Sequence, residues 1–265
     1  MDLGKSYTLI TGASSGIGYA LSHEAAKHQC HLILVARREG LLKKLKHELL
    51  EVYDIDVVLI PIDCAVPGAA KQLYDDVQAK QLHVNCLINN AGFGWMGDFQ
   101  AGKRSTYKDM LTLNVVFLTE LTHLFSEQLA LFAKGHIMQI ASIAAFMPGA
   151  GFAVYYASKA YVLSLGRALA KELRPKGIMV TTVCPGITRT GFFERAEASI
   201  DKAGFLSMSA DKVAAIAYRA MVQGKVLCIP GWHNRFSRWV MMFLPERLLA
   251  SLLFYVNQRL RKPSA

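Results

Sequence analysis

The 265-residue chain has few cysteines, and their spacing matches neither a disulfide-built protein nor a zinc protein. No two cysteines form a C-x-x-C pair, and their number is odd; they are Cys30, Cys64, Cys86, Cys184 and Cys228. We therefore expect neither a disulfide framework nor a four-thiolate zinc site. Reduced thiols favour a cytoplasmic protein, and since no charged-then-apolar leader precedes Tyr7, a secretory signal is not expected.

Other patterns are also missing. There is no Ser/Gly linker, internal repeat or low-complexity segment. The metal-capable residues of segment 28–31 bridge a helix end and a strand, where they are not expected to converge, so no metal is predicted. The length suits one large α/β domain, which we place at residues 1–231, followed by a basic C-terminal extension at 232–265.

Positive charge is present in excess, with a net charge of +10. From Arg235 onward the chain has six basic residues and one acid, Glu246, so half of the excess lies in the last 31 positions. This charge belongs to the tail rather than to a groove. Because no helix-turn-helix, zinc-finger or RNA-binding signature accompanies it, we do not expect nucleic acid as a partner.

Short apolar runs alternate with segments of helical periodicity along most of the chain, a rhythm typical of parallel strands joined by crossover helices. Two clear helices are expected over Glu39–Val52 and Ala153–Leu173. Seven strands are expected, which predicts a doubly wound parallel sheet, a Rossmann fold; they are Tyr7–Thr11, Leu32–Ala36, Val57–Ile62, Cys86–Asn89, His136–Ser142, Met179–Cys184 and Val226–Pro230.

A glycine-rich turn follows the first strand. Gly12 permits a tight turn, while Gly16 and Gly18 let the backbone and the start of a helix approach a pyrophosphate. The spacing is T-G-x-x-x-G-x-G, with Ser14, Ser15 and Ile17 inside the loop. Glycines also serve turns that bind nothing, but a strand–turn–helix context at this place indicates a dinucleotide site.

The second strand ends in Arg37 and Arg38, where an NAD site would usually carry an acid for the ribose hydroxyls. Two guanidiniums favour a ribose 2′-phosphate, since arginine binds phosphate with two parallel hydrogen bonds. The alternative is a solvated basic turn before a helix. We predict NADP(H) as the cofactor.

Four motifs in order resemble the short-chain dehydrogenase/reductase family, from Lys5 to about Gly231. They are Thr11-Gly12-x-x-x-Gly16-x-Gly18, Asn89-Asn90-Ala91-Gly92, Ser142 and Tyr155-x-x-x-Lys159. The resemblance implies that Asn90, Ala91 and Gly92 line the adenine-ribose side, that Asp63 lies against the adenine, and that Pro185, Gly186 and Thr190 flank the nicotinamide carboxamide. It also implies that Lys159 binds the nicotinamide ribose.

Proton transfer can be assigned from the residues themselves. A phenol with an ordinary pKa of about 10 is a poor proton donor and acceptor near neutrality, and a cation one helical turn away would lower that pKa. Tyr155 has such a cation in Lys159, whereas Tyr156 and Tyr161 have none in register. Ser142, at the end of the fifth strand, is expected to orient the substrate oxygen, although it could simply cap a loop.

Asn114 falls within an apolar helical stretch, where asparagine is an unfavourable residue. The resemblance implies that it holds a water that links Lys159 to solvent. The alternative is an amide satisfied by a backbone carbonyl.

After Gly231 an amphipathic helix with basic flanks is expected from Arg247, and Pro245–Arg247 interrupts the apolar run before it could span a bilayer. Three roles stay open for this helix: packing on its own domain or on a sister subunit of a homo-oligomer, lying on a membrane surface, or covering a lipophilic substrate. On one side of it we expect Leu248, Leu249, Leu252, Leu253, Val256 and Leu260.

Apolar residues also favour a hydrophobic carbonyl or alcohol substrate; they are Phe146, Met147, Phe152, Phe192, Phe193, Phe205, Leu206 and Met208, with Lys202 as a basic neighbour. The resemblance to enzymes that reduce 3-oxoacyl groups or oxidise steroids and retinoids names no single substrate. A regulator that binds NADP(H) without turnover is the alternative function.

Overall fold

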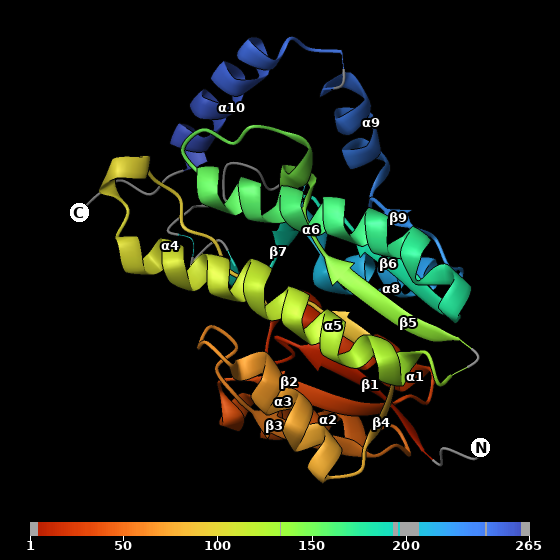
Figure 1. The fold of residues 1–265 in the computed structure, drawn as a ribbon. Coiled ribbons are helices and arrows are strands. Elements are labelled where there is room, and N and C mark those ends of the chain that lie inside the picture. The colour runs from red at the N-terminus through yellow and green to blue at the C-terminus, as the bar shows by residue number, and fades with distance from the viewer. Residues whose placement is uncertain (1–4, 133, 193–195, 197–206, 242, 261–265) are drawn as a thin grey trace.

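The computed structural model describes residues 5–132, 134–192, 196, 207–241 and 243–260. Its centre is a seven-stranded sheet in the order β3-β2-β1-β4-β5-β6-β9, in which each neighbouring pair is parallel (Figure 1). The predicted Rossmann fold is therefore confirmed. The strands are β1 (Ser6–Thr11), β2 (His31–Ala36), β3 (Val57–Pro61), β4 (His83–Asn89), β5 (Gly135–Ile140), β6 (Ile178–Val183) and β9 (Leu227–Cys228).

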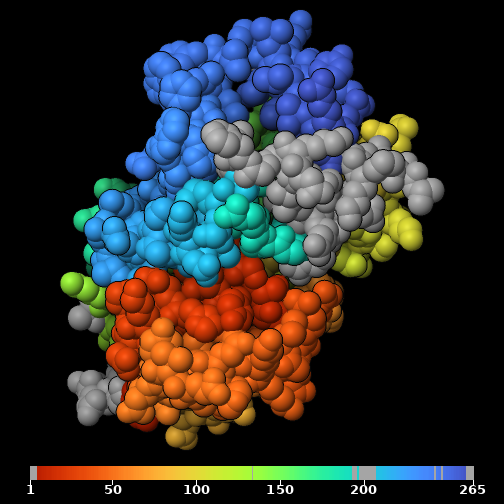
Figure 2. All heavy atoms as spheres, turned by 180° about the vertical axis from the view of Figure 1, so that it is seen from behind, coloured from red at the N-terminus to blue at the C-terminus, as the bar shows by residue number. Residues whose placement is uncertain are grey.

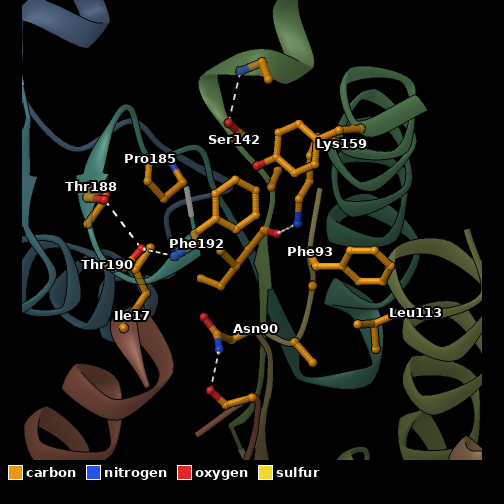
Figure 3. Close-up of a pocket in the computed structure, with 18 of the residues that line it drawn as sticks. Ile17, Asn90, Phe93, Leu113, Ser142, Lys159, Pro185, Thr188, Thr190 and Phe192 are labelled. Carbon is orange, nitrogen blue, oxygen red and sulfur yellow. Dashed lines mark hydrogen bonds between the residues drawn. The ribbon is translucent and has the colours of Figure 1, made fainter. Parts of the chain in front are cut away.

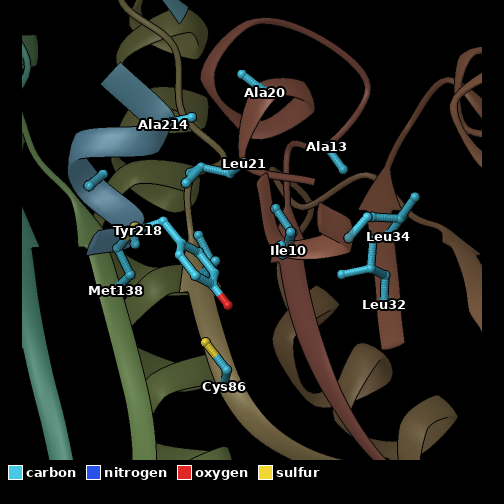
Figure 4. Packing of buried hydrophobic residues seen from close by; sticks show 14 of the residues in the cluster. Ile10, Ala13, Ala20, Leu21, Leu32, Leu34, Cys86, Met138, Ala214 and Tyr218 are labelled. Carbon is cyan, nitrogen blue, oxygen red and sulfur yellow. The ribbon is translucent and has the colours of Figure 1, made fainter. Parts of the chain in front are cut away.

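Helices cover both faces of the sheet, which is why the central strands are nearly continuous apolar runs rather than alternating ones. Leu32–Val35 of β2, for example, is fully buried. On one face lie α1 (Gly16–Lys27), α2 (Glu39–Leu50) and α8 (Ala210–Val222), whose apolar sides form one core cluster with the strands (Figure 4). Burial of each large aliphatic side chain stabilises the fold by about 1.5–3 kcal/mol.

The opposite face carries α3 (Ala69–Ala79), α5 (Leu118–Leu129) and α6 (Ala153–Glu172). The two helices predicted from periodicity are both present, and each ends one or two residues earlier than expected. A short turn, η4 (Arg174–Lys176), follows α6, and Gly177 with φ +78° ends it in the left-handed region that favours glycine.

Helix α6 packs very closely on the sheet at Gly166. A Cβ atom added there would overlap the Thr182 hydroxyl of β6. Only glycine lets the helix axis come this near to the strand. The same helix carries the predicted proton-transfer residues two to three turns earlier, so this contact fixes their height above the sheet.

Short elements surround the carboxyl ends of the strands. They are η1 (Phe99–Ala101), α4 (Arg104–Leu111), the π-helical η2 (Thr112–Phe117), η3 (Ile143–Phe146) and a small parallel ribbon of β7 (Thr188–Arg189) with β8 (Met208–Ser209). The seventh strand is shorter than predicted, because only Leu227–Cys228 pairs with β6.

The chain ends in two further helices, α9 (Trp232–Met241) and α10 (Glu246–Leu260), which lie together beyond α6, at the end of the molecule opposite α2 and α3 (Figure 1). Within the described part of the chain, no helix is long and apolar enough to cross a membrane.

Candidate active site

A cavity of about 520 Å³ opens at the carboxyl ends of β1, β4, β5 and β6. This is where parallel sheets of this kind bind ligands, beside the point at which the strand order reverses. The cavity brings together nearly all of the predicted site residues: Gly12, Ser14, Ser15, Gly16, Ile17, Arg37, Arg38, Asp63, Asn90, Ala91, Gly92, Ser142, Tyr155, Lys159, Pro185, Gly186 and Thr190. Figure 3 shows Ile17 and Asn90 at one end and Ser142 and Lys159 at the other.

The glycine-rich turn has the backbone that a phosphate cradle requires. Gly12 and Gly16 both adopt left-handed conformations, with φ +68° and +60°. Gly18, the third predicted glycine, does not line the cavity; a Cβ there would overlap the Gly12 carbonyl, so it lets helix α1 start directly beneath the turn. The first residues of α1, Gly16 and Ile17, line the cavity, so the helix start lies where anion binding needs it.

The two arginines after β2 have different partners. Arg38 donates from its guanidinium to Ser14 Oγ at 3.3 Å and to Ser15 Oγ at 3.2 Å, so it lies over the glycine-rich turn. Arg37 instead approaches Asp63, with 3.6 Å between Arg37 Nη1 and the carboxylate. Both guanidiniums line the cavity.

The Asn89–Gly92 segment ties β4 to β1. Asn90 donates to the carbonyl oxygens of Thr11 and Gly12, and the Thr11 hydroxyl accepts from the backbone N–H groups of Asn90 and Ala91, each at 3.0 Å. The asparagine therefore holds the glycine-rich turn from below while Ala91 and Gly92 line the cavity floor.

Ser142 caps a turn, and its role toward a substrate stays a prediction. Its hydroxyl accepts a 3.2 Å hydrogen bond from Ala144 N and so caps the η3 turn. It also faces Tyr155, where its hydrogen bond acts to lower the pKa of the phenol. An acceptor from a backbone N–H leaves the serine proton available for donation to the phenol or to a substrate oxygen.

Burial shifts the pKa of both members of the Tyr155–Lys159 pair. Burial raises the pKa of the Tyr155 phenol, and it lowers that of Lys159 to about 8. Lys159 Nζ donates a 2.8 Å hydrogen bond to Ile140 O and lies 5.9 Å from the centre of the Tyr155 ring. The expected lowering of the phenol pKa by the lysine is therefore wrong: desolvation raises this pKa, and the group that lowers it is Ser142, through its hydrogen bond.

Asn114 lies behind the cavity wall, within the π-helical turn η2. Its amide accepts from Phe93 N and donates to Phe93 O and to Ser158 Oγ. The alternative of an amide satisfied by backbone groups is therefore what the structure shows for this side chain. The amide oxygen still approaches the cavity floor, since a Cβ added at Gly92 would lie 3.1 Å from it and 3.4 Å from Lys159 Nζ.

The segment after β6 closes the cavity on the side of the glycine-rich turn. Pro185 O accepts from Ile143 N at 2.8 Å, and the Thr190 methyl group lies close to Gly16. Thr190 Oγ1 accepts from Phe192 N at 3.3 Å, which directs the Phe192 ring toward Tyr155, with 5.2 Å between the ring centres.

An apolar half of the cavity was only partly predicted. Met147, Phe152 and Phe192 line it as expected, whereas Phe146 lies outside it and Met208 belongs to β8. The predicted Phe193, Lys202, Phe205 and Leu206 fall outside the described residues. Wall residues that sequence reasoning missed include Phe93, Met96, Leu113 and Ile187. Phe93, Met96 and Ile187 lie in loops without periodicity, and Leu113 lies in the π-helical η2, so no local pattern marked them as a wall.

Helix α10 supplies a further wall. Leu253, Val256, Asn257 and Leu260 line the cavity, and Asn257 donates to Ala150 O at 2.8 Å. The tail thus packs on its own domain, one of the three predicted roles, and forms a wall of the apolar half of the cavity, while the covering of a substrate stays a prediction. The single apolar side expected for this helix is divided, since Leu249 and Leu253 are buried while Leu248 and Leu252 are exposed.

Comparisons with known proteins agree with this geometry. The chain is 27% identical to the very-long-chain 3-oxoacyl-CoA reductase of Anas platyrhynchos, over 96% of this chain and 81% of that protein. It is 34% identical to a dehydrogenase/reductase SDR family protein 7-like of Dictyostelium discoideum, over 70% of this chain and 60% of that protein.

Among solved structures, a short-chain dehydrogenase from Sphingobium yanoikuyae in complex with NADPH superposes with a TM-score of 0.80 at 29% identity and covers 98% of both chains. The family model for short chain dehydrogenase matches residues 6–201. The chain therefore belongs to the short chain dehydrogenase family, whose members are oxidoreductases acting on CH–OH and C=O groups.

Proposed function

We propose that this protein transfers a hydride between NADP(H) and a hydrophobic carbonyl or alcohol compound, with Tyr155 as the general acid and base. The observation that carries the proposal is one continuous cavity, with a phosphate cradle at one end and Ser142, Tyr155 and Lys159 beneath apolar walls at the other. The nicotinamide of the cofactor would supply the hydride.

The cradle suits a dinucleotide with a 2′-phosphate. Two left-handed glycines expose the amides at the start of α1, and Arg38 lies over the serines of the same turn. Its charge and planar donors match a phosphate, and the Sphingobium relative was solved with NADPH. Arg37 and Asp63 would then flank the adenine end.

Proton transfer would follow from the positions of three side chains. Ser142 donates to the carbonyl oxygen and holds it near the phenol, Tyr155 donates its proton as the oxygen gains charge, and Lys159 stabilises the resulting phenolate through its positive charge. In the oxidative direction Tyr155 accepts the proton from the alcohol. Asn114 fixes the Phe93 backbone beside Lys159, so its role is to position this floor of the site.

The substrate end is wide and apolar. Phe152 stacks on Tyr155 with 4.5 Å between ring centres, and Phe192, Leu253 and Leu260 extend this surface. Such a wall favours an acyl chain or a ring system over a small polar alcohol. The name of the Anas platyrhynchos relative, a very-long-chain 3-oxoacyl-CoA reductase, supports a long acyl substrate.

A regulator that senses NADPH without turnover is not favoured, because it would need the cradle but not a serine beside a buried tyrosine and a buried lysine. A panel of apolar aldehydes, ketones and 3-oxoacyl thioesters separates the two functions when NADPH absorbance is followed. We expect NADPH oxidation with long-chain members of the panel. Tight NADPH binding with no oxidation across the panel would favour the sensor.

Replacement of Tyr155 by Phe tests the proton donor. We expect the rate of NADPH oxidation to fall by about 10²–10⁴, the usual contribution of a positioned acid, while the NADPH Kd stays unchanged. Tyr161→Phe is the matched control, since this tyrosine lies on the same helix with its hydroxyl 2.9 Å from Thr119 Oγ1, away from the cavity. Equal activity of the two variants would remove Tyr155 from the mechanism.

A further inference from the structure

Helix α9 and the short segment that follows it expose a row of large aromatic side chains. Trp232, Phe236, Trp239 and Phe243 recur at spacings of four, three and four residues, which places them along one helical stripe. Their exposed fractions are 75%, 57%, 56% and 69%. Two consecutive pairs of rings also contact each other, Phe236 with Trp239 at 6.2 Å and Trp239 with Phe243 at 5.0 Å between centres. A soluble surface rarely keeps such a patch without a partner.

Helix α10 exposes a second row. Leu248, Leu252 and Tyr255 are 62%, 55% and 66% exposed, while Leu253 and Asn257 on the other side of the helix are buried. The helix is therefore apolar on two sides, one toward the cavity and one toward solvent. Figure 2 shows α9 and α10 from behind, in blue, at the far end from the red and orange N-terminal half.

Basic side chains accompany these rows. Arg235, Arg238 and Trp239, with Leu227 and Ile229 of the β9 region, line a small cavity of about 310 Å³ beneath α9. The Arg238 guanidinium stacks over Phe146 at 4.7 Å, and its buried Nε makes no hydrogen bond with any described residue. Arg235 of the same helix is exposed, so its guanidinium is accessible to an anionic oxygen from outside the chain.

We propose that the face formed by these two rows and by Arg235 and Arg238 docks on an anionic lipid membrane. Tryptophan and tyrosine favour the interfacial region of a bilayer, and arginines beside them bind lipid phosphates. A second copy of the chain fits this face less well, because an isologous contact would bring the same arginines together in a molecule of net charge +10.

Membrane docking would also bring substrate to the site. Helix α10 has its exposed row on one side and its cavity-lining residues on the other. A lipophilic compound dissolved in the bilayer would therefore pass only this helix to reach Leu253 and Leu260, without crossing bulk water. This second step rests on the proposed function, whereas docking itself does not.

The test is flotation of the full-length protein with vesicles of phosphatidylcholine alone and of phosphatidylcholine with phosphatidylglycerol, in the absence of substrate. We expect binding to the anionic vesicles. Phe236→Ser combined with Trp239→Ser should weaken it by about tenfold or more, since two large apolar groups no longer leave water. Val52→Ser with Leu131→Ser is the control, because these side chains are 69% and 63% exposed elsewhere.

Arg235→Glu should weaken binding to anionic vesicles by about 25-fold, from about fivefold per unit of charge near such a surface. Lys171→Glu, at the exposed end of α6, is its control.

Native protein that floats with neither vesicle, or equal loss in control variants, would overturn the proposal. A dimer that the Phe236 and Trp239 substitutions dissociate, without flotation, would assign the face to a second copy. Docking without NADPH oxidation would refute the proposed function alone.

Discussion

Arg37 and Arg38 are adjacent in sequence, yet the backbone at the end of β2 directs them to different ends of one binding surface. Arg38 reaches the serines of the glycine-rich turn, while Arg37 reaches Asp63. Charge alone predicts a pair of equivalent phosphate ligands. The contacts separate them, and of the two only Arg38 hydrogen-bonds to the serines of the turn, which leaves it the better placed for the 2′-phosphate of the neighbouring ribose.

Arg38→Ala should therefore raise the Kd for NADPH by about 10–100-fold, the equivalent of one charge-assisted pair, and leave the Kd for NADH nearly unchanged. Fluorescence titration of both dinucleotides measures the ratio. Arg104→Ala, at the exposed start of α4, is a control that removes one positive charge elsewhere. An equal loss of affinity for NADH and NADPH would contradict the assignment of Arg38 to the 2′-phosphate.

At the same scale, the spacing of Tyr155 and Lys159 predicted which residues meet but not their pKa directions. Two side chains four residues apart lie on the same face of a helix, so the spacing alone predicts that Tyr155 and Lys159 are neighbours. The pKa values depend on burial under Phe152 and Phe192, and these residues come from a loop and from the segment after β6. No local pattern contains that information.

Among the elements, the strands and the long helices were predictable because each has a period that its burial imposes. The π-helical turn η2 and the β7–β8 ribbon were not, since a π turn differs from an α turn by one residue and each ribbon strand has two residues. The wall made by α10 was left among three alternatives. A helix that is apolar on two sides gives the periodic signal of a helix with one broad apolar side.

The two sides of α10 can be tested separately with soluble substrates. Leu260→Ala should raise KM for long-chain 3-oxoacyl thioesters, by about tenfold, because Leu260 packs with the cluster that contains Phe152 and Tyr155. Short-chain KM should change little. Leu252→Ala removes an exposed leucine of the same helix and is expected to leave both KM values unchanged in the absence of vesicles.

If the two leucine variants raise the long-chain KM equally, then loss of helix stability rather than loss of the cavity wall explains the effect. Circular dichroism at equal concentration distinguishes the two cases, since a weakened helix would lose signal in both variants.

The division of the chain at Gly231 stays a prediction, as does assembly into a homo-oligomer.

At the scale of the whole molecule, the buried thiols make stability depend on pH. Burial raises the pKa of Cys64, Cys86 and Cys184 to about 12 and that of Cys228 to about 11. In the unfolded chain these thiols ionise near their ordinary pKa of about 8.5–9. Their contribution is fully present below pH 9 and is lost as the pH rises toward 11–12, because the unfolded state releases protons that the folded state keeps.

We therefore expect the free energy of unfolding, from urea titrations, to fall between about pH 9 and pH 11. In Cys86→Ala the fall should be smaller than in the native protein, since one buried thiol is gone. At neutral pH an aromatic disulfide reagent should label Cys30, the half-buried thiol, well before the other four. Rapid labelling of all five in folded protein would contradict this burial.

Helix α6 transmits any change at the contact of Gly166 with Thr182 to the active site, because Tyr155 lies on the same rigid helix. Tyr155 lies 11 residues, or about 16 Å, along the helix from this point, so a tilt of about 4° there moves the phenol by about 1 Å. A displacement of that size can slow a reaction by about 10². Gly166→Ala is thus expected to lower kcat for carbonyl reduction with the chain still folded, as circular dichroism would show, although the substituted atom never approaches a reactant.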